Sequence, residues 1–572
     1  MTIPCLECHR VRLCLQEGSV ALPQRSTGSI DRRKIMRRLA SILLVLVITA
    51  SFALSSCAPV AGDYDIAINN GRVMDPLTGF DGVANVGIKD GKIAAIVPAE
   101  QKLGGKRVIN ATGLVVAPGF INIHGHATGG GTDGGFHVRD GITTEITGNC
   151  GRTGVFFYDM PGAIQFTPYP VTDFFSEVEK QGLIINIGTY TGNITLREAI
   201  GLKEKDEPTP EQIARMVEMA GQEMKAGSLG ISYGPFYAPG TTYQEMVDIA
   251  KEVLKHGGGA AIHVRYAIPP PRDIEACEEA ISLSKDSGIP ILISHRGGQV
   301  VFPASTDKLI DLITRARAEG VQVASDLQPY TASNTPLKAA VFDIPLEPFA
   351  RLLDVSISDV GVGAAVVIDG KTVIKPGDSF VSFEQFYDIR DRVKAGEIPD
   401  PTVIMHIYKA EKIALYFKSP FVMVENDGLI VKDPNTGKYT GHPRGAGAFA
   451  KFFREYVREQ GICDLMTGIA KCSTMAAVWL GLDNKGRVQV GCDADLTLFD
   501  PEKITDKATY VEPGQPSEGI PYVIVNGVLA VDKGKLTGSK SGKVIKRNWT
   551  VPGVLPELGK AATTDINVLQ QP

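Results

Sequence analysis

The middle of this 572-residue chain alternates apolar runs that end in a polar residue with stretches of helical periodicity, and this alternation constrains the fold most strongly. The apolar runs predict strands at 183–188, 260–264, 290–295 and 321–326. The periodic stretches predict helices at 209–225, 242–255, 272–287 and 306–319. Strands and helices in this order form parallel βα units, so we expect an α/β protein whose residues 118–480 close into a (β/α)8 TIM barrel.

Both ends of the chain show a different pattern, with short alternating strands separated by glycine and Asn-Gly turns. The pattern occupies residues 64–117 and returns at 481–550, before a C-terminal tail at 551–572. We expect the two parts to form one small β-sandwich domain beside the barrel. Residues from about 340 to 400 do not show the alternation of strands and helices, and we expect them to form an inserted loop or subdomain over the barrel mouth.

The first 57 residues resemble an export signal rather than part of a folded core. Arg37 and Arg38 precede an apolar run at 39–54, and the following Ser55-Ser56-Cys57 completes a sequence that resembles a bacterial lipobox. The alternative is a transmembrane anchor, but the run is shorter than the roughly 20 residues that span a bilayer. We therefore expect an exported lipoprotein of the bacterial cell envelope, at the periplasm or cell surface, anchored in the membrane through lipidated Cys57.

Residues 1–35, which precede this signal, are not used to predict the fold. Met36 directly precedes the two arginines and is a natural translation start. Cys5-Leu6-Glu7-Cys8-His9 has the spacing of a c-type haem site, but it lies upstream of the export signal, so haem is not expected. The net charge of −5 and the absence of a long basic run argue against a nucleic-acid partner and leave a small molecule as the expected one.

Six residues of metal-ligand type occur at or near the predicted ends of strands. They are His124, His126, Cys150, His263, His295 and Asp427. Imidazole and thiolate ligands select zinc over magnesium or calcium. The C-terminal ends of barrel strands meet at one face, so we expect a shared site there. A closed structural zinc site would normally need CxxC-type spacing, which does not occur after Cys57, and a catalytic zinc site is therefore favoured.

Several motifs together resemble the amidohydrolase superfamily and, within it, the N-acyl-D-amino-acid deacylases (D-aminoacylases), over most of residues 65 to 535. The segment 118–126 is similar to the superfamily's first-strand His-x-His motif, and 141–151 to the family's Gly-Asn-Cys-Gly segment. Further similar segments are 261–265, 293–295, 426–428, 442–444 and 487–500.

The resemblance implies roles for individual residues. Cys150 would replace the carboxylated lysine of other superfamily members and hold one tightly bound zinc ion with His263 and His295. His124, His126 and Asp427 would define a position for a second zinc ion. Asp427 would act as the catalytic base that later returns its proton to the departing amine.

The implied activity is zinc-dependent hydrolysis of N-acyl-D-amino acids, or of related N-acyl substrates, to a carboxylate and a free amino acid. Arg444 would bind the substrate carboxylate. The segment Asp326-Leu327-Gln328-Pro329-Tyr330 keeps a family tyrosine but places Gln328 at a pocket position, so both Tyr330 and Gln328 are expected to contact substrate.

Other departures leave the acyl or leaving group open. Segment 127–132 lacks the usual acidic residues, and the Arg-Gly-Gly at 296–298 lacks a lysine of the relatives. We expect His137, His256 and His406 to be structural. The alternatives are a cyclic-amide hydrolase of the hydantoinase or dihydroorotase kind, and a surface lipoprotein that binds a ligand without turnover; the retained Asp427 favours an enzyme.

Overall fold

The computed structural model describes residues 60–126, 135–154, 169–266, 272–295, 305–343, 345–352, 355–432 and 437–571. The expected lipidation site Cys57 and its export signal lie outside the described residues, as do segments 127–132 and 296–298. No helix in the described ranges is long and apolar enough to cross a membrane.

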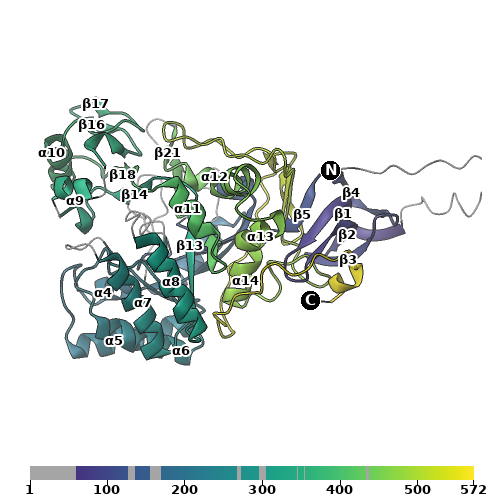
Figure 1. The fold of residues 1–572 in the computed structure, drawn as a ribbon, viewed down its shortest axis with the longest axis horizontal. Helices are drawn as coiled ribbons and strands as arrows, with labels where there is room; N and C mark the ends of the chain where they lie inside the picture. The colour runs from purple at the N-terminus through teal and green to yellow at the C-terminus, as the bar shows by residue number, and fades with distance from the viewer. Residues whose placement is uncertain are drawn as a thin grey trace, which may run out of the picture. The chain divides into compact units, whose positions relative to one another are not determined.

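A nine-stranded sheet combines both ends of the chain (Figure 1). The N-terminal strands are β1 (Val60–Asp75), β2 (Phe80–Lys89), β3 (Lys92–Pro98), β4 (Leu103–Asn110) and β5 (Val115–Pro118), and the C-terminal strands are β22 (Leu496–Phe499), β23 (Tyr522–Val525), β24 (Val528–Asp532) and β25 (Lys535–Leu536). The two sets join where β5 pairs antiparallel with β22. One face packs around a buried cluster that includes Ile68, Val86 and Leu496.

The middle of the chain forms the TIM barrel that the sequence predicts. Its strands, in chain order, are β6 (Phe120–Asn122), β7 (Ile142–Thr147), β8 (Asn186–Thr189), β9 (Thr191–Gly192), β10 (Gly230–Tyr233), β11 (Gly259–Ile262), β12 (Ile291–Ile293), β13 (Val323–Leu327) and β19 (Val422–Val424). They pair in parallel in the order β6-β7-β8 and β9-β10-β11-β12-β13-β19. Tyr190 alone separates β8 from β9, so the two act as one barrel strand.

Hydrogen bonds between the ends of the first and last strands close the barrel. Asn122 Nδ2 donates to Asn426 Oδ1 at 2.8 Å, and the Asn426 N–H donates back to Asn122 Oδ1 at 3.1 Å. The Asp427 N–H then donates to the His124 carbonyl at 3.1 Å. Asn122 and Asn426, which are 304 positions apart in the sequence, therefore become neighbours at the rim.

The four long barrel helices agree with their predicted positions. They are α5 (Pro210–Lys225), α6 (Tyr243–Lys255), α7 (Asp273–Ser287) and α8 (Thr306–Ala318). Thr209 and Thr242 form capping boxes with Gln212 and Glu245, which explains why the first two begin where the pattern predicts. The other helices are α2 (Phe136–Arg139), α3 (Val171–Gln181), α4 (Asn193–Ala199), α11 (Ala410–Phe417), α12 (Arg444–Lys451), α13 (Leu465–Ile469) and α14 (Met475–Leu480), with π-helical turns at Phe452–Glu459 and Ala470–Thr474.

The inserted segment folds into a small subdomain. It contains α9 (Leu346–Leu352), α10 (Phe383–Lys394), and an antiparallel sheet in the order β14 (Ser333–Pro336), β18 (Thr402–Met405), β15 (Val360–Val362). The segment also contains a hairpin of β16 (Val366–Ile368) with β17 (Lys371–Ile374). A second hairpin, β20 (Ile430–Lys432) with β21 (Tyr439–Gly441), follows the last barrel strand β19.

Apolar side chains fill the interior of the barrel. Ile121, Leu292, Ala324 and Met423 belong to one buried cluster, against which Trp549 of the C-terminal tail packs. Trp549 Nε1 also donates to the Leu480 carbonyl at 2.7 Å. The packed interior makes the barrel a core rather than a pore, and the polar groups gather at the C-terminal ends of its strands.

Candidate metal centre

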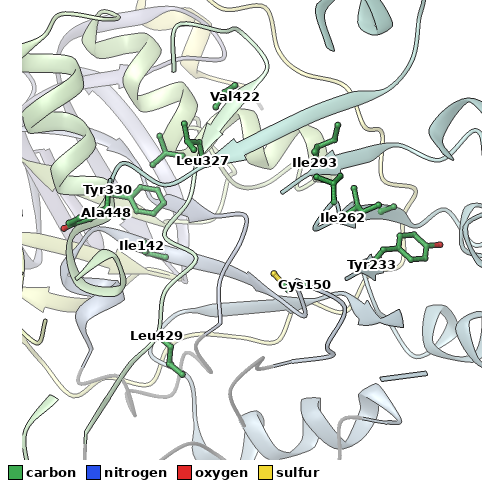
Figure 2. Close-up of a cluster of buried hydrophobic side chains, with 14 of the residues drawn as sticks. Ile142, Cys150, Tyr233, Ile262, Ile293, Leu327, Tyr330, Val422, Leu429 and Ala448 are labelled. Carbon is green, nitrogen blue, oxygen red and sulfur yellow. The ribbon is translucent and has the colours of Figure 1, made fainter. Parts of the chain in front are cut away.

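Five barrel strands each place one residue of metal-ligand type just beyond their last residue. His124 follows β6, Cys150 follows β7, His263 follows β11, His295 follows β12 and Asp427 follows β19. Figure 2 labels Cys150 within one buried cluster that also includes Ile262 and Ile293, the last residues of β11 and β12. All the strands run parallel, so their ends bring these residues to the same end of the barrel.

Cys150 lies at the centre of three histidines. Its Sγ is 3.1 Å from His295 Nε2, 3.5 Å from His124 Nε2 and 3.5 Å from His263 Nδ1. All four residues are buried. The structure therefore brings together the three residues that the resemblance assigns to the tightly bound zinc ion.

Asp427 contacts the other side of the cluster. Its Oδ1 is 2.9 Å from His126 Nε2 and 3.7 Å from His124 Nε2. Its Oδ2 is 3.3 Å from His295 Nδ1 and 2.8 Å from Arg444 Nη2. All six sequence-predicted ligands thus form one connected group.

Three of these residues hold an unusual backbone conformation. Cys150, His295 and Asp427 have φ values of +56°, +42° and +40°, in the left-handed region that residues other than glycine rarely adopt. Such conformations cost free energy and persist where the surroundings fix them. For His295 the fixing contact is with Asp326, whose Oδ1 accepts the His295 N–H at 2.6 Å.

Burial and neighbouring charges set the protonation of the cluster. Burial lowers the pKa of His124, His263 and His295 well below the usual histidine range, so these rings are neutral and offer a lone pair. Burial, and then the carboxylates of Asp427, Asp326 and Glu425, raise the pKa of Cys150.

The pKa of Asp427 shifts in the opposite direction from that of Cys150. Burial alone would raise the pKa of Asp427, but Arg444, His295 and His126 outweigh it and hold the pKa well below the usual carboxyl range. Asp427 is therefore an anion at neutral pH.

The donor set fits zinc. One ligand atom from each of His124, Cys150, His295 and Asp427 lies within 4.8 Å of the others. Neutral imidazoles and a sulfur atom are ligands that zinc prefers, and a bound cation would deprotonate the thiol that burial otherwise keeps neutral. The residues present therefore fit the zinc ion that the sequence predicts.

A second layer of polar residues supports this centre. Gly125 lies between the two histidines, and a Cβ there would meet Glu145 Oε1 at 2.1 Å, so the glycine permits the close approach of Glu145. His137, expected to be structural, contacts Glu145 through Nδ1 and lies 3.2 Å from Asn426 Nδ2 through Nε2. It thereby positions the residue next to Asp427. Neither contact has a local sequence signal.

A cavity opens onto the metal-ligand side chains. Its lining residues are Phe236, Tyr237, His263, Tyr266, His295, Ser333, Asn334, Thr335, Val341, Phe342, Leu346, Met405, Ile407, Tyr408, Asp427 and Arg444. The aromatic wall was not predicted from the sequence. The Phe236 ring stacks on the Tyr266 ring with centroids 5.1 Å apart, and it lies tilted against the His263 ring at 4.5 Å. The polar-aromatic Tyr-Gly-Pro-Phe-Tyr at 233–237, at the end of β10, was its only signal.

The three residues expected to contact substrate do not all line the cavity. Arg444 lines the cavity, whereas Tyr330 and Gln328 are not among the lining residues. Gln328 uses its side chain within its own turn, where Oε1 accepts the Tyr330 N–H at 2.7 Å and Nε2 donates to the Tyr330 carbonyl at 2.8 Å. The Tyr330 hydroxyl lies 3.4 Å from an oxygen of Asp506. These side-chain contacts are structural, and the expected contact of Gln328 and Tyr330 with substrate stays a prediction.

The other two histidines that we expect to be structural, His256 and His406, lie outside the cluster. His256 contacts Glu252 on its own helix at 3.1 Å. The His406 ring packs edge-on against Tyr510, with centroids 4.6 Å apart.

Comparison with known proteins agrees with the site. The chain is 28% identical over 519 residues to a D-aminoacylase of Alcaligenes xylosoxydans xylosoxydans, covering 85% of this chain and 98% of the relative. It is also 28% identical over 530 residues to an N-acyl-D-glutamate deacylase of the same organism, covering 87% and 99%. No protein-family model matches the chain.

The chain is also similar to solved structures of deacylases. An N-acyl-D-glutamate deacylase from Bordetella bronchiseptica, in complex with zinc and a phosphonate inhibitor, superposes with a TM-score of 0.71 at 25% identity, covering 85% of this chain and all of that one. A D-aminoacylase structure superposes with a TM-score of 0.69 at 25% identity and with the same coverage.

Fold and site together define a metal-dependent amidohydrolase with a TIM barrel and a β domain. Within that class, the similarity to the N-acyl-D-amino-acid deacylases expected from the motifs is confirmed.

Replacing the central sulfur tests the zinc centre. In Cys150→Ser we expect zinc affinity to fall by about 100-fold or more, because a serine hydroxyl does not replace a thiolate ligand. Competition with a chromophoric zinc chelator measures this change. Cys472→Ser alters another buried cysteine outside the cluster and should keep the wild-type affinity. Equal affinities in all three proteins would contradict the assignment.

Proposed function

We propose that this protein hydrolyses the amide bond of N-acyl-D-amino acids, releasing a carboxylate and a free amino acid. One observation carries the proposal: the Asp427 carboxylate lies against the zinc-ligand cluster and Arg444 at the edge of a largely apolar cavity. This arrangement provides a base, a carboxylate-binding guanidinium and room for an apolar group within one site.

Asp427 is the residue that moves the proton. A zinc ion in this cluster supplies a Lewis acid that polarises an amide carbonyl and lowers the pKa of water. The contacts with Arg444 and His126 keep Asp427 ionised and fix its two oxygens in different directions. Asp427 can then accept a proton from the attacking water and return it to the departing amine nitrogen.

Arg444 has capacity to bind the substrate α-carboxylate. Its side chain is buried, and its Nη2 lies 2.8 Å from Asp427 Oδ2. Its Nε has no hydrogen-bond partner among the described residues, so donors remain for a second carboxylate. A planar guanidinium that contacts both the base and the substrate would orient the scissile bond toward Asp427.

The cavity composition supports apolar substrate side chains. Phe236, Tyr266, Phe342, Met405 and Ile407 form much of the wall. Arg444 is the one Lys or Arg side chain among the described lining residues. Because the α-carboxylate would occupy Arg444, an acidic substrate side chain would lack a cationic partner and would be desolvated without compensation.

A substrate panel tests both parts of this proposal. We expect the zinc-loaded protein to hydrolyse N-acetyl-D-leucine, N-acetyl-D-methionine and N-acetyl-D-phenylalanine, with kcat/KM at least about tenfold higher than for N-acetyl-D-glutamate and N-acetyl-D-aspartate. Amine release is the measurement, and the L-enantiomers serve as controls. Faster hydrolysis of the acidic substrates would refute the side-chain assignment, and no release from any D-substrate would refute the deacylase activity.

The role of Asp427 as base has a separate test. Asp427→Asn keeps the shape of the side chain but cannot accept the proton, so we expect kcat to fall by about 10²- to 10⁴-fold. Zinc measured by atomic absorption should remain bound through Cys150, His263 and His295. Asp369→Asn changes an exposed turn residue of the insertion and should retain full activity. Wild-type kcat in the zinc-loaded Asp427→Asn protein would rule out this role.

We also propose that the enzyme is exported and anchored to the membrane of the bacterial cell envelope through lipidated Cys57. The basic pair, the apolar run and the Ser-Ser-Cys ending at 55–57 support this proposal. Cells that express the full chain should incorporate labelled palmitate into it, and Cys57→Ser should abolish the label. A labelled Cys57→Ser protein, or an unlabelled wild type, would contradict the proposal.

A further inference from the structure

One face of helix α10 packs against a chain segment that forms part of the cavity wall. This segment, residues 337–343, precedes α9 and contributes Phe342 to the wall. The residues of α10 that contact it are Phe386, Arg390 and Lys394. They are spaced by four positions, so they lie on the same face of the helix. The helix therefore supports the wall from the side away from the cavity.

The first contact is between aromatic rings. The Phe342 ring meets the Phe386 ring edge-on, with centroids 5.4 Å apart, and both residues are buried. The Phe386 ring packs in the same way against Phe380 at 5.1 Å. Edge-to-face pairs of this kind are favourable beyond the apolar area that they bury. A residue that lines the cavity thus takes part of its position from α10.

The second contact is made by the Arg390 guanidinium, whose side chain is only 6% exposed. Its Nε donates to the Leu337 carbonyl at 3.1 Å, and its Nη2 donates to the Ala339 carbonyl at 3.3 Å. The same Nη2 donates to Asp343 Oδ1 at 2.6 Å. A planar guanidinium that bonds to acceptors along the whole segment fixes the shape of that segment.

Asp343 directly follows Phe342 and contacts two further cations. Its Oδ1 lies 2.6 Å from Lys394 Nζ, and its Oδ2 lies 2.8 Å from Lys205 Nζ, in the loop between α4 and α5. Burial raises the pKa of Asp343, but the three cations outweigh this effect and hold the pKa well below the usual carboxyl range. Since Lys205 is largely exposed and Arg390 is buried, the pair with Arg390 is the stronger contact.

We propose that the ion pair of Arg390 and Asp343 determines side-chain specificity by holding Phe342 in the cavity wall. Both are positioning residues, because neither is among the described residues that line the cavity. When the pair is intact, the wall fits a bulky apolar side chain of the substrate. This inference rests on the proposed deacylase function and names the contact that sets the preference for such substrates.

Steady-state kinetics with two substrates of different size test the pair. In Asp343→Asn we expect KM for N-acetyl-D-phenylalanine to rise about tenfold at unchanged kcat, because the amide has no charge to pair with Arg390. For N-acetyl-D-alanine we expect KM to change by less than about twofold, because a methyl group makes little contact with the wall. Arg390→Lys keeps the charge but loses the planar donor geometry, and it should show the same selective rise in KM.

Hydrogen–deuterium exchange provides a second measurement that needs no substrate. The amides of Leu337, Ala339 and Phe342 donate to backbone carbonyls, so the intact segment protects them. We expect these amides to exchange faster in the full-length Asp343→Asn and Arg390→Lys proteins than in the wild type. The exchange of the barrel strands should stay the same, which separates release of this segment from general unfolding.

Asp388→Asn is the matched control. It makes the same chemical change on α10 two positions away from Phe386, where the carboxylate is exposed and pairs with Arg392 at 3.1 Å. We expect wild-type KM values for both substrates and wild-type exchange in this variant.

Unchanged exchange of segment 337–343 in both Asp343→Asn and Arg390→Lys would overturn the proposal. Equal changes in KM for the two substrates, or no change for either, would also overturn it, since a selective wall contact requires a difference between them. If the wild type released no amine from any D-substrate, the proposed deacylase function would fail, and the preference inferred from it would fail as well. The exchange measurement would still decide whether the ion pair holds the wall.

Discussion

The burial of several acidic groups at one end of the barrel is the constraint on which the rest of the site depends. Cys150 and Asp427 meet three buried histidines there, and the Arg444 guanidinium contacts Asp427. Buried charges are tolerated only when opposite charges or metal ions compensate them. Arg444 supplies one such charge for Asp427, and a zinc ion bound among the histidines would supply another for the Cys150 sulfur.

The barrel makes this concentration of charge possible by separating two kinds of residue along each strand. Apolar side chains such as Leu292 and Met423 fill the interior below, and the tail residue Trp549 packs against the same cluster. The polar residues follow at the strand ends, where Cys150, His295 and Asp427 adopt left-handed backbone conformations. The packed core supplies the rigidity that holds this strained backbone in place.

Substrate recognition comes from elements outside the regular barrel. Phe236 and Tyr237 follow β10, whereas Met405 and Tyr408 come from the end of the inserted subdomain. Arg444 begins α12, lines the same cavity and places its Nη2 2.8 Å from Asp427 Oδ2. The barrel thus positions the metal-ligand residues, and the loops and the insertion shape the cavity that would select a substrate, as is usual for this fold.

Much of the fold and of the ligand set could be predicted because it rests on local patterns. The capping boxes at Thr209 and Thr242 fix the starts of two helices, and the alternation of strands and helices gives the barrel. The six ligand positions follow from residue type at strand ends, together with the family resemblance. Gln328 shows the limit of this reasoning, because its amide bonds within its own turn, and that choice depends on the loop conformation.

The sequence by itself determined the fold class and named the candidate metal ligands and the expected base, since strand periodicity and ligand-type residues are visible in short segments. Only the tertiary structure decided which side chains lack partners and which residues face the cavity. Glu425 looks like any acidic residue in the sequence, and only the folded chain shows that both of its oxygens are buried without a hydrogen-bond partner among the described residues. Compensation of buried charge is a property of the whole packed site, and no local pattern encodes it.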